Sequence, residues 1–91
     1  MHCFDWNDQK NEELRNERGI TFEEVIFNIM HDGLLDTIEP PNSDKYANQK
    51  IFIVNIEDYI YLVPFDESEE SIFLKTIIPS RKMTKKYLGG K

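Results

Sequence analysis

The chain has little of several features that would define a function at once. Its 91 residues include a single cysteine, Cys3, which excludes an internal disulfide and a zinc site built from several thiolates. Four glycines are present, and none belongs to a phosphate-binding glycine-rich loop or a nucleophile elbow. The two histidines, His2 and His31, are isolated from each other and from acidic residues at metal-ligand spacing. No metal and no other cofactor is therefore expected.

Long hydrophobic runs are also missing. The uninterrupted apolar runs are only a few residues long, too short for a membrane span or for the core of a secretory signal. The apolar content of 40% is still enough for one small core, and the length leaves no room for a second. These features predict a single domain over residues 1–91 in a soluble, cytoplasmic protein without membrane contact.

Acidic side chains are absent from the last 21 residues, and the charge of the chain is strongly segregated as a result. Residues 71–91 contain six Lys or Arg, whereas residues 1–70 contain all 17 acidic side chains and five basic ones. The net charge is −12 for the first part and +6 for the second, within a total of −6. A cationic end on an anionic body indicates a partner that carries phosphate or carboxylate groups.

Two helices are predicted in the first third of the chain. Residues 7–18 (NDQKNEELRNER) are strong helix formers, and Gly19 is a typical C-terminal stop. Thr21 and Glu24 fit a capping box at the start of a second helix, which Gly33 ends. Its expected apolar stripe, with helical spacing, consists of Phe22, Val25, Ile26, Ile29 and Met30.

Strands are predicted in the middle of the chain and a last helix at its end. Residues 50–56 and 59–65 are apolar on both faces and flank Glu57-Asp58, which predicts a hairpin in the centre of a sheet. Residues 34–39 predict a short strand, 40–48 a polar loop, and 72–78 a further strand that Pro79 stops. Ser80 is a candidate N-cap for a helix over 81–88. The expected fold is α+β: two N-terminal helices, an antiparallel sheet of three to four strands and a C-terminal helix.

The basic residues near the end of the chain are the candidate site. On a helix that begins near Ser80, Lys82, Lys85 and Lys86 share one face that could contact a phosphate backbone. The same lysines could be an ordinary solvated face that the helix dipole favours. Lys75, within an apolar strand, indicates either a site or an edge lysine that blocks aggregation. Arg81, at the corner between strand and helix, could hold a phosphate by two hydrogen bonds or pair with a nearby carboxylate.

Three segments together resemble the BrnT family of type II toxins. They are residues 4–11 (FDWNDQKN), 19–24 (GITFEE) and 77–84 (IIPSRKMT). The family opens with F-E/D-W-D-x-x-K, continues with K-H-G-[IV]-x-F-E-E and closes with I-I-S-A-R-x-A-T at a strand-to-helix corner. The resemblance spans most of the chain. It implies a compact RelE-like fold, metal-independent cleavage of RNA, and neutralisation by a DNA-binding antitoxin encoded beside the toxin.

The resemblance also implies roles for individual residues. Arg81 matches the family's corner arginine and is expected to stabilise the phosphate during cleavage. Lys75 and Lys85 would support it, and Tyr87 would donate a proton or stack on a base. Arg18 stands where the family has histidine, Thr76 where it has a basic residue, and Pro79 where it has serine. The residues expected to bind RNA are Lys82, Lys86 and Arg18.

Three functions remain open at this point. The chain is a ribonuclease toxin with a cognate antitoxin and RNA as partners, or a non-catalytic interaction module of the same fold that binds an antitoxin-like protein, or a small structural or regulatory protein. A homo-oligomer and a toxin–antitoxin hetero-oligomer are both compatible with the sequence. Convergence of Lys75, Arg81 and Lys85 on one phosphate would distinguish the first function from the second.

Overall fold

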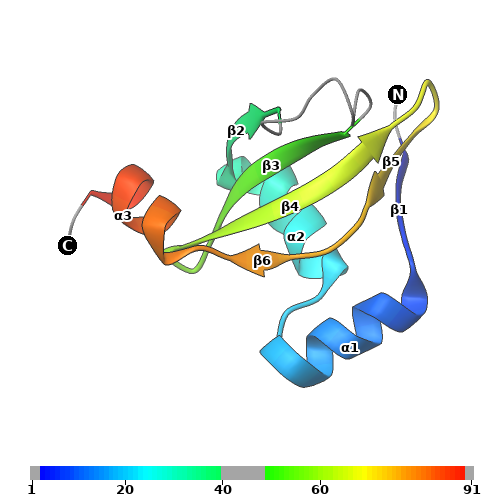
Figure 1. Ribbon diagram of the computed structural model, residues 1–91, viewed down its shortest axis with the longest axis horizontal. Helices are drawn as coiled ribbons and strands as arrows, with labels where there is room; N and C mark the ends of the chain where they lie inside the picture. The colour runs from blue at the N-terminus through cyan, green and yellow to red at the C-terminus, as the bar shows by residue number, and fades with distance from the viewer. Residues whose placement is uncertain (1–2, 40–48, 90–91) are drawn as a thin grey trace.

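The computed structural model describes residues 3–39 and 49–89, arranged as helices on both faces of a twisted sheet (Figure 1). The loop predicted at 40–48 lies outside the described residues. The α+β class is confirmed. The elements follow in the order β1 (Cys3–Trp6), α1 (Asp8–Arg18), α2 (Phe22–Asn28), a π-helical turn η1 (Ile29–Gly33), β2 (Leu34–Ile38), β3 (Gln49–Ile56), β4 (Tyr59–Glu67), β5 (Ser71–Leu74), β6 (Ile78–Pro79) and α3 (Arg81–Leu88).

The sheet is larger than predicted and is mixed. Its strand order is β1-β5-β4-β3-β2, and β6 also pairs with β4. The expectation of three to four antiparallel strands was therefore wrong, because β1 pairs with β5 in parallel, from Cys3 opposite Ser71 to Trp6 opposite Leu74. A strand of four residues has too short an alternating pattern to be recognised in a sequence, and its partner lies near the other end of the chain.

The strand predicted over 72–78 is split in two by a bulge. Leu74 lies opposite Phe65, and Ile78 lies opposite Leu62, so the chain advances four residues where β4 advances three. The extra residue allows Ile77 to bury its side chain completely in the core. The N–H of Lys75 still donates to the carbonyl oxygen of Pro64 at 2.8 Å.

The hairpin of β3 and β4 is central, as predicted. Its pairing runs without a break from Gln49 opposite Asp66 to Ile56 opposite Tyr59. The connecting residues Glu57 and Asp58 both adopt left-handed backbone conformations, with φ of 52° and 64°. Two consecutive positive φ angles are the geometry of a type I′ turn, which usually contains Asn-Gly. This sequence forms the turn with two acidic residues instead.

The main core lies between the sheet and the first two helices. Leu14 of α1 and Phe22 and Val25 of α2 are fully buried against alternate residues of β3 and β4. Thr21 caps α2 and Gly19 ends α1 with φ of 67°, as the sequence predicted. Asn7, which was predicted as the first residue of the helix, is instead the N-cap of α1. Met30 differs from the prediction. It is 72% exposed, because α2 ends at Asn28 and η1 leaves helical geometry at its third residue.

The opposite face of the sheet holds α3. Ile53 and Ile60 are fully buried on this face. Two hydrogen bonds join the start of α3 to β4: the Ser80 N–H donates to the Ile60 carbonyl at 2.9 Å, and the Ile60 N–H donates to Thr84 Oγ1 at 2.9 Å. Within the first turn of α3, Thr84 Oγ1 donates to the Ser80 carbonyl at 2.7 Å. The predicted extent of α3 and its Ser80 N-cap are confirmed.

Candidate functional site

Four exposed basic side chains lie along one side of α3. Met83 and Tyr87 are half-buried on the side that faces the sheet. The remaining side is open to solvent because the helix is short and packs only through that one stripe. The exposed basic residues, called the cationic face below, are Arg81, Lys82, Lys85 and Lys86.

The cationic face has no carboxylate partner among residues 3–39 and 49–89. The ion pairs of the described chain involve other cations, such as Arg15 with Glu12 and Lys50 with Glu67. Lys86 makes one weak contact, with its Nζ 5.8 Å from the ring centre of Tyr87. Like charges one helical turn apart repel each other. An anion bound to this face would relieve that repulsion.

Arg81 occupies the first position of α3, directly after the corner formed by Pro79 and Ser80. Ser80 Oγ accepts the N–H of Met83 at 3.2 Å, which leaves the first N–H groups of the helix directed outward. The positive end of the helix dipole is located there as well. Arg81 therefore begins α3 at the end of the helix where an anion is favoured most.

Lys75 belongs to a different part of the sheet. Its Nζ lies 3.7 Å from Asp66 Oδ2 of β4. The backbone of Lys75 is bonded to Pro64, whereas that of Ser80 is bonded to Ile60. Four residues along a strand correspond to about 13 Å. The structure therefore does not bring Lys75 together with Arg81.

Tyr87 also points away from the cationic face. Its hydroxyl donates a hydrogen bond to Asp36 Oδ2 of β2 at 3.2 Å. Partial burial and the Asp36 carboxylate raise the pKa of Tyr87. The phenol is therefore held in its neutral form and joins α3 to the edge strand.

Arg18 lies at the end of α1. Its Nη1 donates to the carbonyl oxygen of Ile77 at 2.6 Å, next to the bulge that precedes β6. The side chain is otherwise exposed, so most of its five N–H donors remain available. In this structure Arg18 supports the segment that leads to Arg81.

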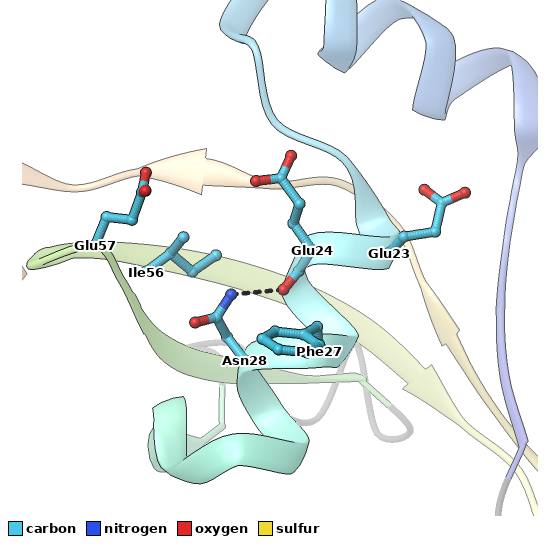
Figure 2. A pocket seen from close by; sticks show the side chains of 6 residues that line it. All are labelled: Glu23, Glu24, Phe27, Asn28, Ile56 and Glu57. Atoms are coloured by element: carbon cyan, nitrogen blue, oxygen red, sulfur yellow. Dashed lines mark hydrogen bonds between the residues drawn. The ribbon is translucent and has the colours of Figure 1, made fainter.

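A second feature was missed by the sequence reasoning. A pocket of about 400 Å³ lies between α2 and the end of the β3–β4 hairpin (Figure 2). Its lining, called the acidic pocket below, consists of Glu23, Glu24, Phe27, Asn28, Ile56 and Glu57.

The carboxylates around the acidic pocket come from separate elements. Figure 2 shows Glu57 on the hairpin and Glu23 and Glu24 on the first turn of α2. A hydrogen bond from Asn11, at 2.8 Å, lowers the pKa of Glu23 and keeps it ionised. No Lys or Arg of the described chain lies within ion-pair distance of these three. The sequence signal was present, but Glu24 was interpreted as a capping residue and Glu57 as a turn residue.

Within the described residues there is no group of three or more His, Cys, Asp or Glu side chains that could hold a metal ion. No helix in residues 3–39 or 49–89 is long and apolar enough to cross a membrane. Comparison with protein-family models, with curated proteins and with solved structures finds no match to this chain. The family resemblance rests on the sequence motifs alone.

Proposed function

We propose that the protein binds RNA through the cationic face and is the toxin of a type II toxin–antitoxin system, a metal-independent ribonuclease that a cognate antitoxin neutralises. The observation that carries the proposal is a set of four exposed basic side chains on α3 without carboxylate partners in the described chain. Phosphate contacts by such side chains supply most of the affinity of proteins for nucleic acids. The motifs that resemble the BrnT family are the basis for proposing a toxin and a cleavage reaction.

In the proposed reaction, the cationic face holds the phosphate that is cleaved. The 2′-hydroxyl of the preceding ribose attacks phosphorus and loses its proton, and the bond from phosphorus to the 5′-oxygen breaks and that oxygen gains a proton. The products are a 2′,3′-cyclic phosphate and a 5′-hydroxyl. Arg81 can stabilise the pentacoordinate intermediate by two parallel hydrogen bonds. Lys85, one helical turn later, adds a second positive charge.

One observation favours a second function, a non-catalytic interaction module. Lys75 and Tyr87, the other expected catalytic residues, are each held by a carboxylate outside the cationic face. Without a proton donor and acceptor beside Arg81, the same face would bind an acidic segment of an antitoxin-like protein and leave RNA intact.

The test compares wild type with Arg81→Ala after induced expression, following growth and RNA integrity. Arg15→Ala is a matched control, because Arg15 is an exposed arginine on α1 outside the cationic face. We expect growth arrest and RNA cleavage with wild type and the control, and relief of both with Arg81→Ala. Intact RNA and unimpeded growth with wild type would contradict the proposed ribonuclease activity. Binding of RNA without cleavage would favour the second function.

A further inference from the structure

The molecule carries two exposed surfaces of complementary character. The first is the acidic pocket, whose lining residue Phe27 is 59% exposed. The second is the cationic face, next to which Ile78 of β6 is 41% exposed. Each surface thus combines uncompensated charge of one sign with exposed apolar area. Contiguous exposed apolar side chains beside charged ones are typical of interaction sites.

Both surfaces lie at the same end of the sheet. Glu57 is at the tip of the β3–β4 hairpin, and α3 begins beside Ile60, the second residue of β4. Figure 1 shows α3 and this hairpin tip at one end of the molecule, away from the N-terminus.

The two surfaces also lie on opposite faces of the sheet. Ile56 belongs to the core under α2. Tyr87 bonds to Asp36, which is paired with Ile53 on the other face. A two-fold axis in the plane of the sheet at this end would bring each acidic pocket against the cationic face of the other copy.

We propose that two copies of this chain form such a two-fold dimer, with α3 of each copy seated on the acidic pocket of the other. A lysine of α3 can lay its aliphatic stem on Phe27 and Ile56 and direct its ammonium group to Glu24 and Glu57. The charges of one surface compensate those of the other, and the dimer contains two equivalent contacts because of its two-fold symmetry. Closed two-fold dimers are the commonest form of homo-oligomer.

The proposed dimer is weak and sensitive to salt. Each copy carries a net charge of −6, so the copies repel each other at long range at low ionic strength. At about 0.15 M salt the Debye length is about 8 Å, which screens the long-range repulsion more than the close ion pairs. We expect association near this salt concentration and dissociation at about 1 M, where exposed ion pairs are screened as well.

The test is sedimentation equilibrium of the full chain and of two charge-reversed variants. The first variant carries Glu24→Lys and Glu57→Lys, and the second carries Lys82→Glu and Lys85→Glu. Wild type is expected to be in equilibrium between monomer and dimer. Each variant alone is expected to be a monomer, because its two surfaces then have the same sign. An equimolar mixture of the two variants is expected to form a heterodimer, because all of its contacts are again complementary.

A matched control carries Glu13→Lys and Glu17→Lys on the exposed side of α1, which is the same change of charge outside both surfaces. It is expected to associate as wild type does, and thermal melting checks that every variant is folded. Phe27→Ser weakens the dimer without a change of charge. A wild type that stays monomeric at all concentrations overturns the proposal. Three other results also overturn it: either charge-reversed variant dimerises alone, the mixture does not associate, or wild type forms open-ended oligomers.

The dimer does not depend on the proposed activity toward RNA, since it is measured without RNA. If both proposals hold, the dimer covers the cationic face, and RNA and the second copy compete for α3.

Discussion

Nη1 of Arg18 donates a hydrogen bond to the carbonyl oxygen of Ile77 at 2.6 Å, although the two residues are 59 positions apart. This bond connects the end of α1 to the bulge between β5 and β6. Because Arg81 follows that bulge, Arg18 contributes to the position of the corner that carries it.

Arg18→Ala is expected to destabilise the fold. The substitution leaves the partly buried Ile77 carbonyl without its charged donor, and such a hydrogen bond contributes about 1.5–3 kcal/mol. Urea denaturation of the variant measures the loss, with Arg15→Ala as the exposed control. If Arg18 acts only by touching RNA, the variant would instead keep its stability and lose affinity for RNA.

Asn11→Ala is expected to cost stability for a different reason. Asn11 is the buried polar side chain of the described core, and its Oδ1 accepts the N–H of Phe22 at 2.8 Å. Its removal leaves that buried N–H without an acceptor, which costs about 1–3 kcal/mol. The free energy of unfolding measures the change. Asn16→Ala, an exposed position on the same helix, should be at least as stable as wild type, because alanine is the better helix former. A loss at Asn16 as large as that at Asn11 would contradict the role of the buried hydrogen bond.

The stability of the fold should decrease in acid partly through Glu23. The hydrogen bond from Asn11 lowers the pKa of Glu23 from its ordinary value of 4.5. A group whose pKa is lower in the folded state stabilises the fold above its unfolded pKa, and this contribution is lost as the pH falls through the folded pKa. Unfolding of wild type and Glu23→Gln across pH 2 to 7, roughly the range of carboxyl titration, measures it. The two should differ near neutral pH and converge in acid; a constant difference would contradict this origin.

The hairpin turn offers a stabilising substitution. Glu57 and Asp58 adopt positive φ, which costs a non-glycine residue about 1–2 kcal/mol relative to the right-handed region. Glu57→Asn with Asp58→Gly provides the preferred residues of a type I′ turn. We expect a gain of about 1 kcal/mol, seen as a rise in melting temperature of about 4–8 °C for a domain of this size. A fall in stability would mean that the two carboxylates make favourable contacts in the folded state.

Removal of charge from the cationic face should reduce the salt dependence of RNA binding. Each phosphate contact contributes about 0.7 to the slope of log affinity against log salt for single-stranded nucleic acid. The triple variant Lys82→Gln, Lys85→Gln and Lys86→Gln should therefore lower the slope by about 2, as titrations at several salt concentrations would measure. Lys50→Gln, on β3 and paired with Glu67, is the control and should leave the slope unchanged. An unchanged slope in the triple variant would show that RNA binds elsewhere.

The parts of the fold that depend on local chemistry were predictable from the sequence. Thr21, Ser80 and Gly19 define helix ends because caps and left-handed stops act over a few residues. The strand β1 was not predictable, since its pairing with β5 depends on residues near the other end of the chain. The split of the strand after Leu74 is likewise set by the fit of Ile77 into a core that the sequence does not display.

The candidate site likewise has features that the sequence predicts and features that only the structure reveals. The lysines of α3 could be placed on one face because helical spacing alone decides that. The contacts of Lys75 with Asp66 and of Tyr87 with Asp36 depend on strand register and on the docking of α3, so only the structure reveals them. The acidic pocket depends on the approach of the hairpin tip to α2, which no local pattern indicates.

The parallel pairing of β1 with β5 has a consequence for the order of folding. Cys3 lies opposite Ser71, so β1 has no partner in the sheet until β5 has been synthesised. Contacts between residues so distant in sequence slow folding, because the loop between them must close before the contact is gained. The β3–β4 hairpin can form early and locally, whereas β1 can join the sheet only after β5 has been made. Substitutions in β1 should accordingly accelerate unfolding and leave the folding rate almost unchanged.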